Sequence, residues 1–477
     1  MGPAPGDGGP TDLSELRKLF GERLIAPSDK GYDLARKVRN RAFDSVKPRA
    51  VVMATSTEDV QRAVEWAGAH DVPIVPRCGG HSYVGQSTTE GLVVSLQPMA
   101  NVALDKKEMI AQVGGGAITI DVNVALLQQD VALPTGSCPS VGIAGLTLGG
   151  GIGFSGRKWG LMCDNLVGVE VVLPSGKVVQ ADEKNLPELL WACRGGAGGA
   201  FGIVTAFRYR VHAVEPVSSY SIKWPWSAAS EVLDAWQRWA PHAPDGLFSV
   251  CTLTKNKETP SIGSHGRFFG SAKELRKLIE PLLAAAAPRR SKVSDRTLWG
   301  SSVTGPKCWP DPNVCHSFNH PQPGRYGQTS YKVKSDYFRE YLSEEGRDTL
   351  IRGIESAQDQ AITWGGVILD SMGGAINRVP KDATAYVHRD SLIQAEYVAH
   401  WRRKTKPEKV AANLAWMNGL YASMRPYASG ECYQNYPDLD LKDWETAYFG
   451  SNLERLRECK RKVDPDGLFR GRHIITG

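Results

Sequence analysis

Hydrophobic and polar positions in the first part of the chain follow the pattern of a mixed α/β domain. Residues 12–20 carry apolar side chains at helical spacing, and the apolar runs 50–53 and 72–76 have the length of buried strands. Residues 57–69, between those runs, begin with Thr-Glu-Asp and predict a helix. Strand, helix and strand in succession indicate an α/β unit. The same patterns predict further strands at residues 92–96, 110–113, 166–173 and 202–211 and a helix at residues 118–129.

The pattern changes near residue 216, where Trp and Tyr become frequent. Helices are expected at residues 228–239 and 272–286, and strands at 385–388 and 392–398 are expected to alternate in antiparallel fashion. The last segment shows turns and helices without a core of its own, so it should pack on the first domain. The predicted segments are an N-terminal tail and helix (1–27), a first domain (28–215), a second domain (216–425) and a returning C-terminal segment (426–477).

Composition and charge narrow the functional class. Hydrophobic residues make up 42% and charged residues 23%, as in globular proteins, and no apolar run is long enough to span a bilayer. The net charge of +6 is spread along the chain, which disfavours nucleic-acid binding. The N-terminus lacks the basic and apolar regions of a signal peptide. A monomeric, cytoplasmic enzyme of small molecules is expected, or a secreted one if the chain has been trimmed.

Nine cysteines in 477 residues form no Cys-x-x-Cys pair, so most should be reduced thiols. Cys308 and Cys315 lie in a Pro-rich loop beside His316 and His320. They could form a disulfide or a metal site, but two unpaired thiols are the expectation, and no bound metal is predicted.

Glycine is concentrated in loops at residues 77–85, 136–153 and 194–204. Residues 151–156 satisfy the dinucleotide motif G-x-G-x-x-G, but more glycine precedes them where a strand is required, so a nicotinamide site is not predicted. A single loop of this kind is usually a tight turn. Three of them, with His81 and Cys138 embedded, predict a cradle for an extended ligand.

The motifs resemble one known family. They are Gly-Gly-His-Ser at 79–82, Gly-Ser-Cys-Pro-Ser-Val-Gly at 136–142, Gly-Gly-Gly-Ile-Gly at 149–153, and Tyr-Gln-Asn-Tyr-Pro-Asp-Leu-Asp-Leu at 433–441. With residues 382–389, 448–452 and 464–469, they make the chain similar to the berberine-bridge-enzyme-like branch of the vanillyl-alcohol oxidase flavoproteins. The likeness runs from about Ser28 to Ile475.

The resemblance implies an α+β fold. It consists of a two-part FAD-binding domain (28–215 and 426–477) and a substrate domain with an antiparallel sheet backed by helices. It also implies covalent FAD, with His81 bonded to the 8α-methyl carbon and Cys138 bonded to C6 of the flavin. Alone, each residue would be an ordinary turn or core residue. Ala200 replaces the Asn usual in the family, so one polar contact near the adenosine is not expected. The other expected cofactor-binding residues are Arg77, Gly79, Gly80, Ser82, Gly85, Val141, Gly142, Gly145, Gly149, Gly153, Ile203, Val204 and Asn435.

In the family, flavin N5 accepts a hydride while a base takes the hydroxyl proton, and Tyr436 is the predicted base. A phenol with a pKa near 10 needs a stabilised phenolate, for which Arg77 or Lys442 are candidates. In an extended chain, Tyr433 and Asn435 share the face opposite Tyr436. Asn435 is therefore assigned to the flavin and Tyr433 to packing or a secondary substrate contact.

The residue three beyond the cysteine, Val141, is small, which by resemblance predicts an oxidase that reduces O2 to H2O2. The second domain is expected to supply the substrate wall through Tyr386, His388, Gln394 and Glu396, close to Trp364 and Trp401. Aromatic rings with hydrogen-bonding groups suit a sugar. The predicted reaction is oxidation of the C1 hydroxyl of a mono- or oligosaccharide, such as cellobiose, to the lactone. Alcohol oxidation or oxidative cyclisation of a secondary metabolite, and a non-catalytic storage or interaction protein, are the alternatives.

Overall fold

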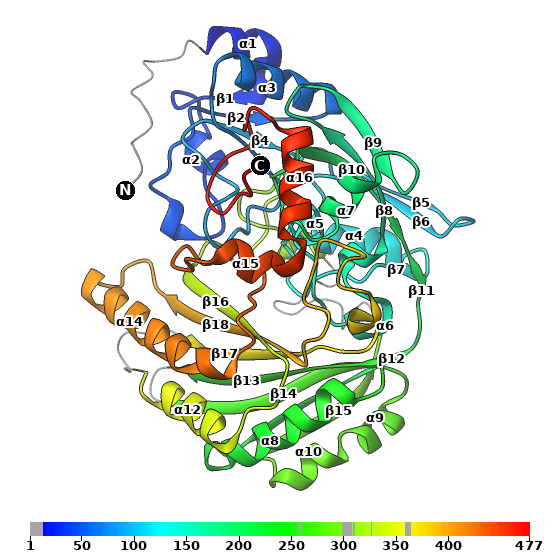
Figure 1. The fold of residues 1–477 in the computed structure, drawn as a ribbon, viewed down its shortest axis with the longest axis vertical. Coiled ribbons are helices and arrows are strands. Elements are labelled where there is room, and N and C mark those ends of the chain that lie inside the picture. The colour runs from blue at the N-terminus through cyan, green and yellow to red at the C-terminus, as the bar shows by residue number, and fades with distance from the viewer. Residues whose placement is uncertain (1–12, 257–258, 298–307, 309–310, 326, 358–363) are drawn as a thin grey trace.

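A computed structural model describes residues 13–477 with gaps at 257–258, 298–307, 309–310, 326 and 358–363 (Figure 1). It contains a four-stranded sheet, a five-stranded sheet, a short two-stranded ribbon and a seven-stranded sheet. Figure 1 shows the four-stranded and five-stranded sheets in the upper part of the molecule and the seven-stranded sheet in the lower part. The C-terminal helices, drawn in red, lie above the seven-stranded sheet. The α+β class expected from the sequence is confirmed.

The first half of the molecule contains the four-stranded and five-stranded sheets and the C-terminal helices, and the second half contains the seven-stranded sheet. The four-stranded sheet comes first in the chain. Its order is β1-β2-β4-β3, and β2, β4 and β3 are parallel. Helix α3 links β2 to β3; it is N-capped by Ser56, whose hydroxyl accepts from the Asp59 N–H at 3.2 Å. The core beneath it includes Phe20, Val52 and Val94. The elements are α1 (Ser14–Phe20), β1 (Leu24–Ile25), α2 (Tyr32–Ala35), β2 (Ala50–Met53), α3 (Thr57–Ala69), β3 (Ile74–Arg77) and β4 (Leu92–Ser95).

The five-stranded sheet follows with order β5-β6-β10-β8-β9, all antiparallel. The C-terminal helices pack into its core, where Phe449 and Leu456 join Leu190 and Phe201. Its elements are β5 (Val102–Asp105), β6 (Ile110–Gly114), α4 (Thr119–Leu127), α5 (Ile143–Leu148), α6 (Gly156–Trp159), β8 (Leu166–Val172), β9 (Val178–Asp182), α7 (Pro187–Cys193), β10 (Ile203–Arg210), α15 (Trp444–Phe449) and α16 (Leu453–Val463). The ribbon pairs β7 (Val131–Ala132) with β11 (His212–Ala213). This packing supports the predicted return of the C-terminal segment, while the exact domain boundaries stay a prediction.

The seven-stranded sheet is antiparallel with order β15-β12-β14-β13-β17-β18-β16. Helices cover one face of this sheet, where Val367 and Leu369 belong to the core shared with the helices. Ile368 and Asp370, which alternate with them along β17, lie on the opposite face of the sheet. Its strands are β12 (Val217–Trp224), β13 (Leu247–Asn256), β14 (Thr259–Phe269), β15 (Arg290–Arg296), β16 (Ser330–Phe338), β17 (Trp364–Ser371) and β18 (Ile393–Trp401). Its helices are α8 (Ala229–Trp239), α9 (Ala272–Leu278), α10 (Glu280–Ala285), α12 (Glu344–Glu355), α13 (Ala375–Arg378) and α14 (Pro407–Met424).

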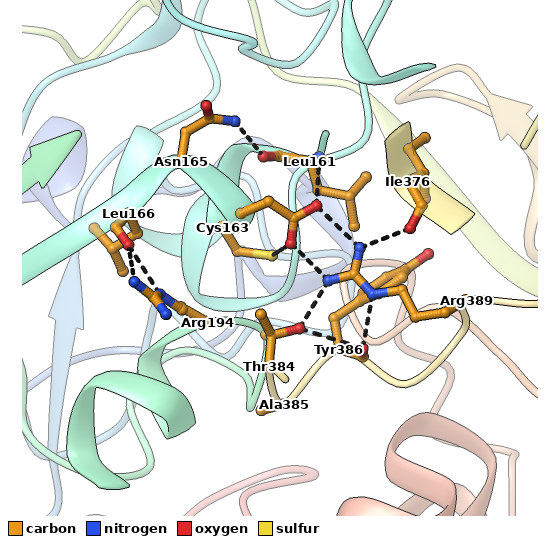
Figure 2. A network of polar contacts seen from close by, with 12 residues as sticks. Leu161, Cys163, Asn165, Leu166, Arg194, Ile376, Thr384, Ala385, Tyr386 and Arg389 are labelled. Atoms are coloured by element: carbon orange, nitrogen blue, oxygen red, sulfur yellow. Dashed lines mark hydrogen bonds and ion pairs between the residues drawn. The ribbon is translucent and has the colours of Figure 1, made fainter. Parts of the chain in front are cut away.

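The strand expected at residues 385–388 is wrong, because the segment is a buried loop. Its backbone bonds to the first half through Tyr386 N–H and the Arg194 carbonyl (3.2 Å). Arg389 fixes the loop: its guanidinium makes a two-pronged ion pair with Asp164 at 2.6 and 2.9 Å. It also donates to Thr384 Oγ1 and to the carbonyls of Ile376 and Tyr386 (Figure 2). This network joins the two halves.

Cys308 and Cys315 form a disulfide with a Cα separation of 5.5 Å, so the expectation of two unpaired thiols is wrong. Both are buried against Ile118 and Ile120. Structural disulfides are typical of oxidising compartments, which does not favour the cytoplasmic expectation. Among the helices of the described ranges, none combines the length and apolar character needed to cross a bilayer.

Candidate active site

A cavity of about 580 Å³ lies where the three glycine-rich loops meet the C-terminal segment. It has the size of a small-molecule or cofactor site. The residues expected at the site that line it are Gly79, Gly80, His81, Ser82, Gly85, Cys138, Val141, Gly142, Gly145, Val204, Tyr433, Asn435 and Tyr436. The three loops predicted to form a cradle therefore do enclose one space.

Two of the loops touch through glycine. A Cβ at Gly79 would collide with the Gly142 nitrogen, and a Cβ at Gly142 would collide with Cys78 and the Gly79 nitrogen. Only glycine permits this backbone approach, which brings the His81 loop against the Cys138 loop. A Cβ at Gly145 would meet no protein atom within 4 Å. Its surface is thus open to an occupant of the cavity.

The imidazole of His81 is held in its neutral form. Burial, together with the charge of Arg39, lowers the pKa of His81 to about 3. Its Nε2 lies 2.9 Å from Ser140 Oγ, on the adjoining loop. The Ser140 contact engages Nε2, whereas Nδ1 makes no hydrogen bond within the described part of the chain and carries a lone pair when the proton is on Nε2.

The side chain of Cys138 is accessible from the space of the same cavity, which lies within the body of the protein. Burial by the surrounding protein and the charge of Glu396 raise the pKa of its thiol, while Arg39 lowers it. Val141 follows on the cavity wall, and its carbonyl accepts from the Thr119 N–H at 2.8 Å. The segment 138–141 is thereby anchored to the start of α4.

The segment Tyr433–Tyr436 is a turn, so the predicted alternation of faces is wrong. The Tyr436 N–H donates to the Tyr433 carbonyl at 2.8 Å, and the two rings pack edge to face at 4.9 Å between centroids. Tyr433 Oη accepts from the backbone N–H groups of Gly151 (2.9 Å) and Ile152 (3.2 Å) and from Asn435 Nδ2 (3.1 Å). Tyr433 is committed to holding the glycine loop. Both Tyr436 and Asn435 face the cavity.

The charged groups that act on Tyr436 are the carboxyl groups of Glu396 and Asp370, and not the predicted cations Arg77 and Lys442. Tyr83 stacks on Tyr436 at 5.4 Å and donates to Glu396 Oε1 at 3.2 Å. Burial, then the charges of Glu396 and Asp370, raise the pKa of Tyr436 well above 10. Burial and Asp370 raise the pKa of Glu396 to about 8, and burial raises that of Asp370 to about 7.

The cations expected to stabilise a phenolate lie elsewhere. Arg77 donates to backbone carbonyls of Ala35, Arg36 and Ser87 and so braces the loop, which corrects its assignment to direct cofactor contact. Lys442 is exposed. A resting phenolate at Tyr436 is therefore disfavoured.

Several predicted residues lie behind the cavity wall. Gly149 and Gly153 allow close packing, because a Cβ would collide with Asn435 and with the Thr135 carbonyl, respectively. Ile203 belongs to the core of the four-stranded sheet. The remaining three are fully buried: Tyr386 bonds to Tyr337 Oη (2.7 Å), His388 stacks on Tyr337, and Gln394 donates to the Ala395 carbonyl. Of the four predicted substrate residues, two contact the described cavity lining: Glu396 accepts a hydrogen bond from Tyr83, and the Tyr386 ring packs edge to face on Tyr433 at 6.2 Å between centroids.

Sequence reasoning missed Tyr83, Asp370, Ser140 and Arg39. A signal existed for Asp370, since it alternates with Ile368 on one face of an otherwise apolar strand. Ser140 lies inside the motif at 136–142, and Tyr83 directly follows the motif at 79–82, within the glycine-rich loop 77–85. For Arg39 there was no local signal, because its effect on His81 depends on the loop packing that joins the Arg39 N–H to the Gly80 carbonyl (3.0 Å).

The residues fit a large flat cofactor such as FAD. Gly145 leaves a face that a side chain would fill, His81 offers a neutral ring nitrogen, and Cys138 opens onto the same space. The glycine loops add backbone N–H groups, which suit a pyrophosphate.

Comparisons with known proteins agree with this geometry. Residues 48–182 match the family "FAD binding domain" and residues 432–475 match "Berberine and berberine like". The chain is 34% identical to an uncharacterised FAD-linked oxidoreductase, YgaK, from Bacillus subtilis, over 96% of this chain and 97% of that protein. It is 31% identical to xylooligosaccharide oxidase from Thermothelomyces thermophilus, over 88% and 86% of the two chains. The solved structure of Physcomitrella patens BBE-like 1 superposes with a TM-score of 0.87 at 30% identity, covering 98% and 99%.

Proposed function

The chain belongs to the berberine bridge enzyme-like family of FAD-linked oxidoreductases, and from that premise we propose that it oxidises the C1 hydroxyl of a mono- or oligosaccharide to the lactone, with O2 reduced to H2O2. It is an FAD-dependent enzyme with an oligosaccharide oxidase among its relatives. The observation that carries the sugar assignment is the pair Tyr436 and Tyr83 in the cavity lining, with the carboxyl groups of Glu396 and Asp370 close behind them.

FAD, when bound, supplies the hydride acceptor and passes the two electrons to O2. His81 Nδ1 and Cys138 Sγ would hold it by covalent bonds, since Ser140 engages the other nitrogen of His81 and the thiol faces the cavity. Asn435 would orient the ring from the side of the turn, because its amide is fixed by the Leu146 carbonyl and Tyr433 Oη.

Tyr436 would take the proton of the substrate hydroxyl. Its own proton would pass to Glu396 as that happens, because the neighbouring carboxylates oppose a standing phenolate. Glu396 must be ionised to accept it, and its pKa of about 8 places that change in the working range. Tyr83, which stacks on Tyr436 and bonds to Glu396, would hold the two groups in register.

The sugar would lie against aromatic side chains on the face of the large sheet that is opposite its helices. Tyr331, Trp364 and Tyr83 cluster there with Val333 and Val398. Aromatic faces bury the apolar side of a sugar ring while carboxyl and phenol groups bind its hydroxyls. Asp370 and Glu396 lie on β17 and β18 at this face. This arrangement favours a sugar over a wholly apolar metabolite.

Bicovalent attachment predicts that acid-precipitated protein stays yellow. Single replacements Cys138→Ala and His81→Ala should each leave one bond, and the double replacement should release the flavin. Mass spectrometry of a proteolytic digest should find one flavin joining the two peptides that contain His81 and Cys138.

Cys78→Ser is the matched control, since Cys78 also lines the cavity and its thiol contacts the Ala117 carbonyl, a bond that serine can keep. It should leave the linkage intact. A colourless wild-type pellet, or unchanged flavin peptides in Cys138→Ala, would contradict the attachment at that point.

The substrate class is tested by peroxide release. Cellobiose, lactose and glucose are screened with H2O2 detection, and the expected result is one H2O2 per O2 consumed and lactone as product. Val141, a small side chain on the cavity wall beside Cys138, supports the use of O2. Bleaching of the flavin under anaerobic conditions by a non-sugar alcohol alone would favour the secondary-metabolite alternative. No bleaching by any of these compounds would favour a non-catalytic protein.

A further inference from the structure

A second cluster of chemically active side chains lies away from the FAD cavity. Asp121 on α4 meets His316 and His320, which follow the short helical turn Pro312–Cys315. His316 Nε2 lies 2.8 Å from Asp121 Oδ1, and His320 Nε2 lies 3.8 Å from Asp121 Oδ2. One candidate ligand atom from each residue falls within a span of 4.8 Å. Both histidines are buried.

The other nitrogens of the two rings share one backbone acceptor. His316 Nδ1 lies 2.7 Å and His320 Nδ1 3.2 Å from the Gln322 carbonyl oxygen. A proton on Nδ1 that is donated to this carbonyl leaves Nε2 with its lone pair free, the arrangement usual for metal-bound histidine. The Gln322 N–H can donate to His320 Nδ1 at 3.1 Å, which favours the opposite tautomer of this ring; a metal ion at Nε2 would select the tautomer with the proton on Nδ1.

The observation that points to a bound ion is the environment of His320 Nε2. This atom is buried, and within the described part of the chain it has no hydrogen-bond partner. Leaving such an atom unsatisfied costs free energy, and the two imidazoles are already close, at 3.9 Å between ring centroids. A hydrogen bond between Asp121 and His316 alone explains only one of the two rings.

We propose that Asp121, His316 and His320 bind a divalent transition metal ion, with zinc as the best fit. Two imidazole nitrogens and one carboxylate oxygen are a common three-ligand set for zinc, with the fourth position left to water. Ligands at about 2.0–2.2 Å from a tetrahedral ion lie roughly 3.3–3.6 Å apart. The observed separations bracket this value, so the ion requires only small rotations of the side chains.

The ion would fasten a loop of the second half onto the helix that supports Cys138. The disulfide Cys308–Cys315 holds the same loop, and Ile118 and Ile120 pack on it. At the start of α4, the N–H groups of Thr119 and Ile120 donate to the carbonyls of Val141 and Pro139 at 2.8 and 2.9 Å. The site therefore has a structural role that does not depend on which substrate the enzyme oxidises.

The test uses tag-free full-length holoprotein, with metal content measured by mass spectrometry and ZnCl2 titrated calorimetrically into chelator-treated protein. Wild type should bind about one zinc, and its Tm should fall by about 3–5 °C on chelation. His320→Gln should lose both the zinc and the response while keeping the contact between Asp121 and His316. His70→Gln is the matched control, because His70 pairs with Glu15 at 3.3 Å without a second histidine, and it should retain both.

Two results would overturn the proposal. In the first, chelator-treated wild type neither takes up zinc nor changes its Tm, and the cluster is then a hydrogen-bonded ion pair only. In the second, His320→Gln binds zinc as tightly as wild type. If His320→Gln does not accumulate, zinc X-ray absorption on wild type decides. Scattering from two imidazoles supports the site, and a sulfur shell near ~2.3 Å excludes it.

Discussion

Tyr436→Phe is expected to slow anaerobic flavin reduction by the sugar by a factor of about 10²–10⁴, the usual contribution of a general base. The phenol is lost while the ring remains to stack on Tyr83 and to pack on Tyr433, so substrate binding should change little. Stopped-flow measurement of the flavin spectrum separates the two effects: the limiting rate falls, and the half-saturating sugar concentration stays nearly constant.

Glu396→Gln and Tyr433→Phe make this experiment specific. Glu396→Gln keeps a side chain of the same size beside Tyr83 but cannot accept a proton. In wild type the reduction rate should rise as pH passes through about 8, where Glu396 becomes ionised, and this rise should disappear in the variant. Since Asp370 interacts with Glu396, the apparent value belongs to the pair. Tyr433→Phe removes a hydroxyl that holds Gly151 and should impair flavin positioning without changing the pH profile.

A near-normal rate in Tyr436→Phe, combined with a large loss in Glu396→Gln, would instead make the carboxylate the base. The two variants therefore distinguish a tyrosine base that passes its proton on from direct proton transfer to Glu396. Either result leaves the sugar specificity to be judged separately by the peroxide screen.

The cofactor cradle could be predicted because glycine carries a local signal. The backbone can approach closely at Gly79 and Gly142, and can leave an open surface at Gly145, only because these positions have no side chain. The glycines that allow this are visible in the sequence itself. Substrate contacts could not be predicted in the same way. Tyr386 and His388 are residue types that often bind sugars. Their loop, however, is held against the first half by the contact of Arg389 with Asp164, and both side chains are fully buried. Alternating residues alone do not distinguish a strand from an extended buried loop.

Long-range pairing accounts for the other differences. Tyr83 and Glu396 are separated by 313 positions, and only the packing of the two halves brings them to 3.2 Å. The local sequence around Cys308 and Cys315 does not specify a Cα separation of 5.5 Å, because a loop of that length can also hold the two residues apart. The alternation predicted for an extended chain separates Tyr436 from Tyr433 and Asn435, but the turn at residues 433–436 brings all three to the cavity.

Replacing Arg389 by methionine is expected to destabilise the protein by about 3–5 kcal/mol, the cost of removing one partner from a buried ion pair. Asp164 would remain in the interior without its counter-ion, and the carbonyls of Ile376 and Tyr386 would lose a donor (Figure 2). Urea unfolding followed by tryptophan fluorescence measures the change, with the flavin absorbance recorded in parallel.

Arg455→Met provides the comparison, because Arg455 makes an equally two-pronged contact with Glu188, at 2.8 Å on both sides, at the surface. With the Arg455 and Glu188 side chains 39% and 52% exposed, that pair should contribute no more than about 1 kcal/mol. Equal losses in the two variants would mean that burial does not set the value of the Arg389 contact. A larger loss in Arg389→Met, accompanied by poor flavin retention, is expected because its loop supports Gly150 and Gly195, where a Cβ would meet the Tyr386 side chain. The joint between the two halves would then also hold the cofactor loops in place.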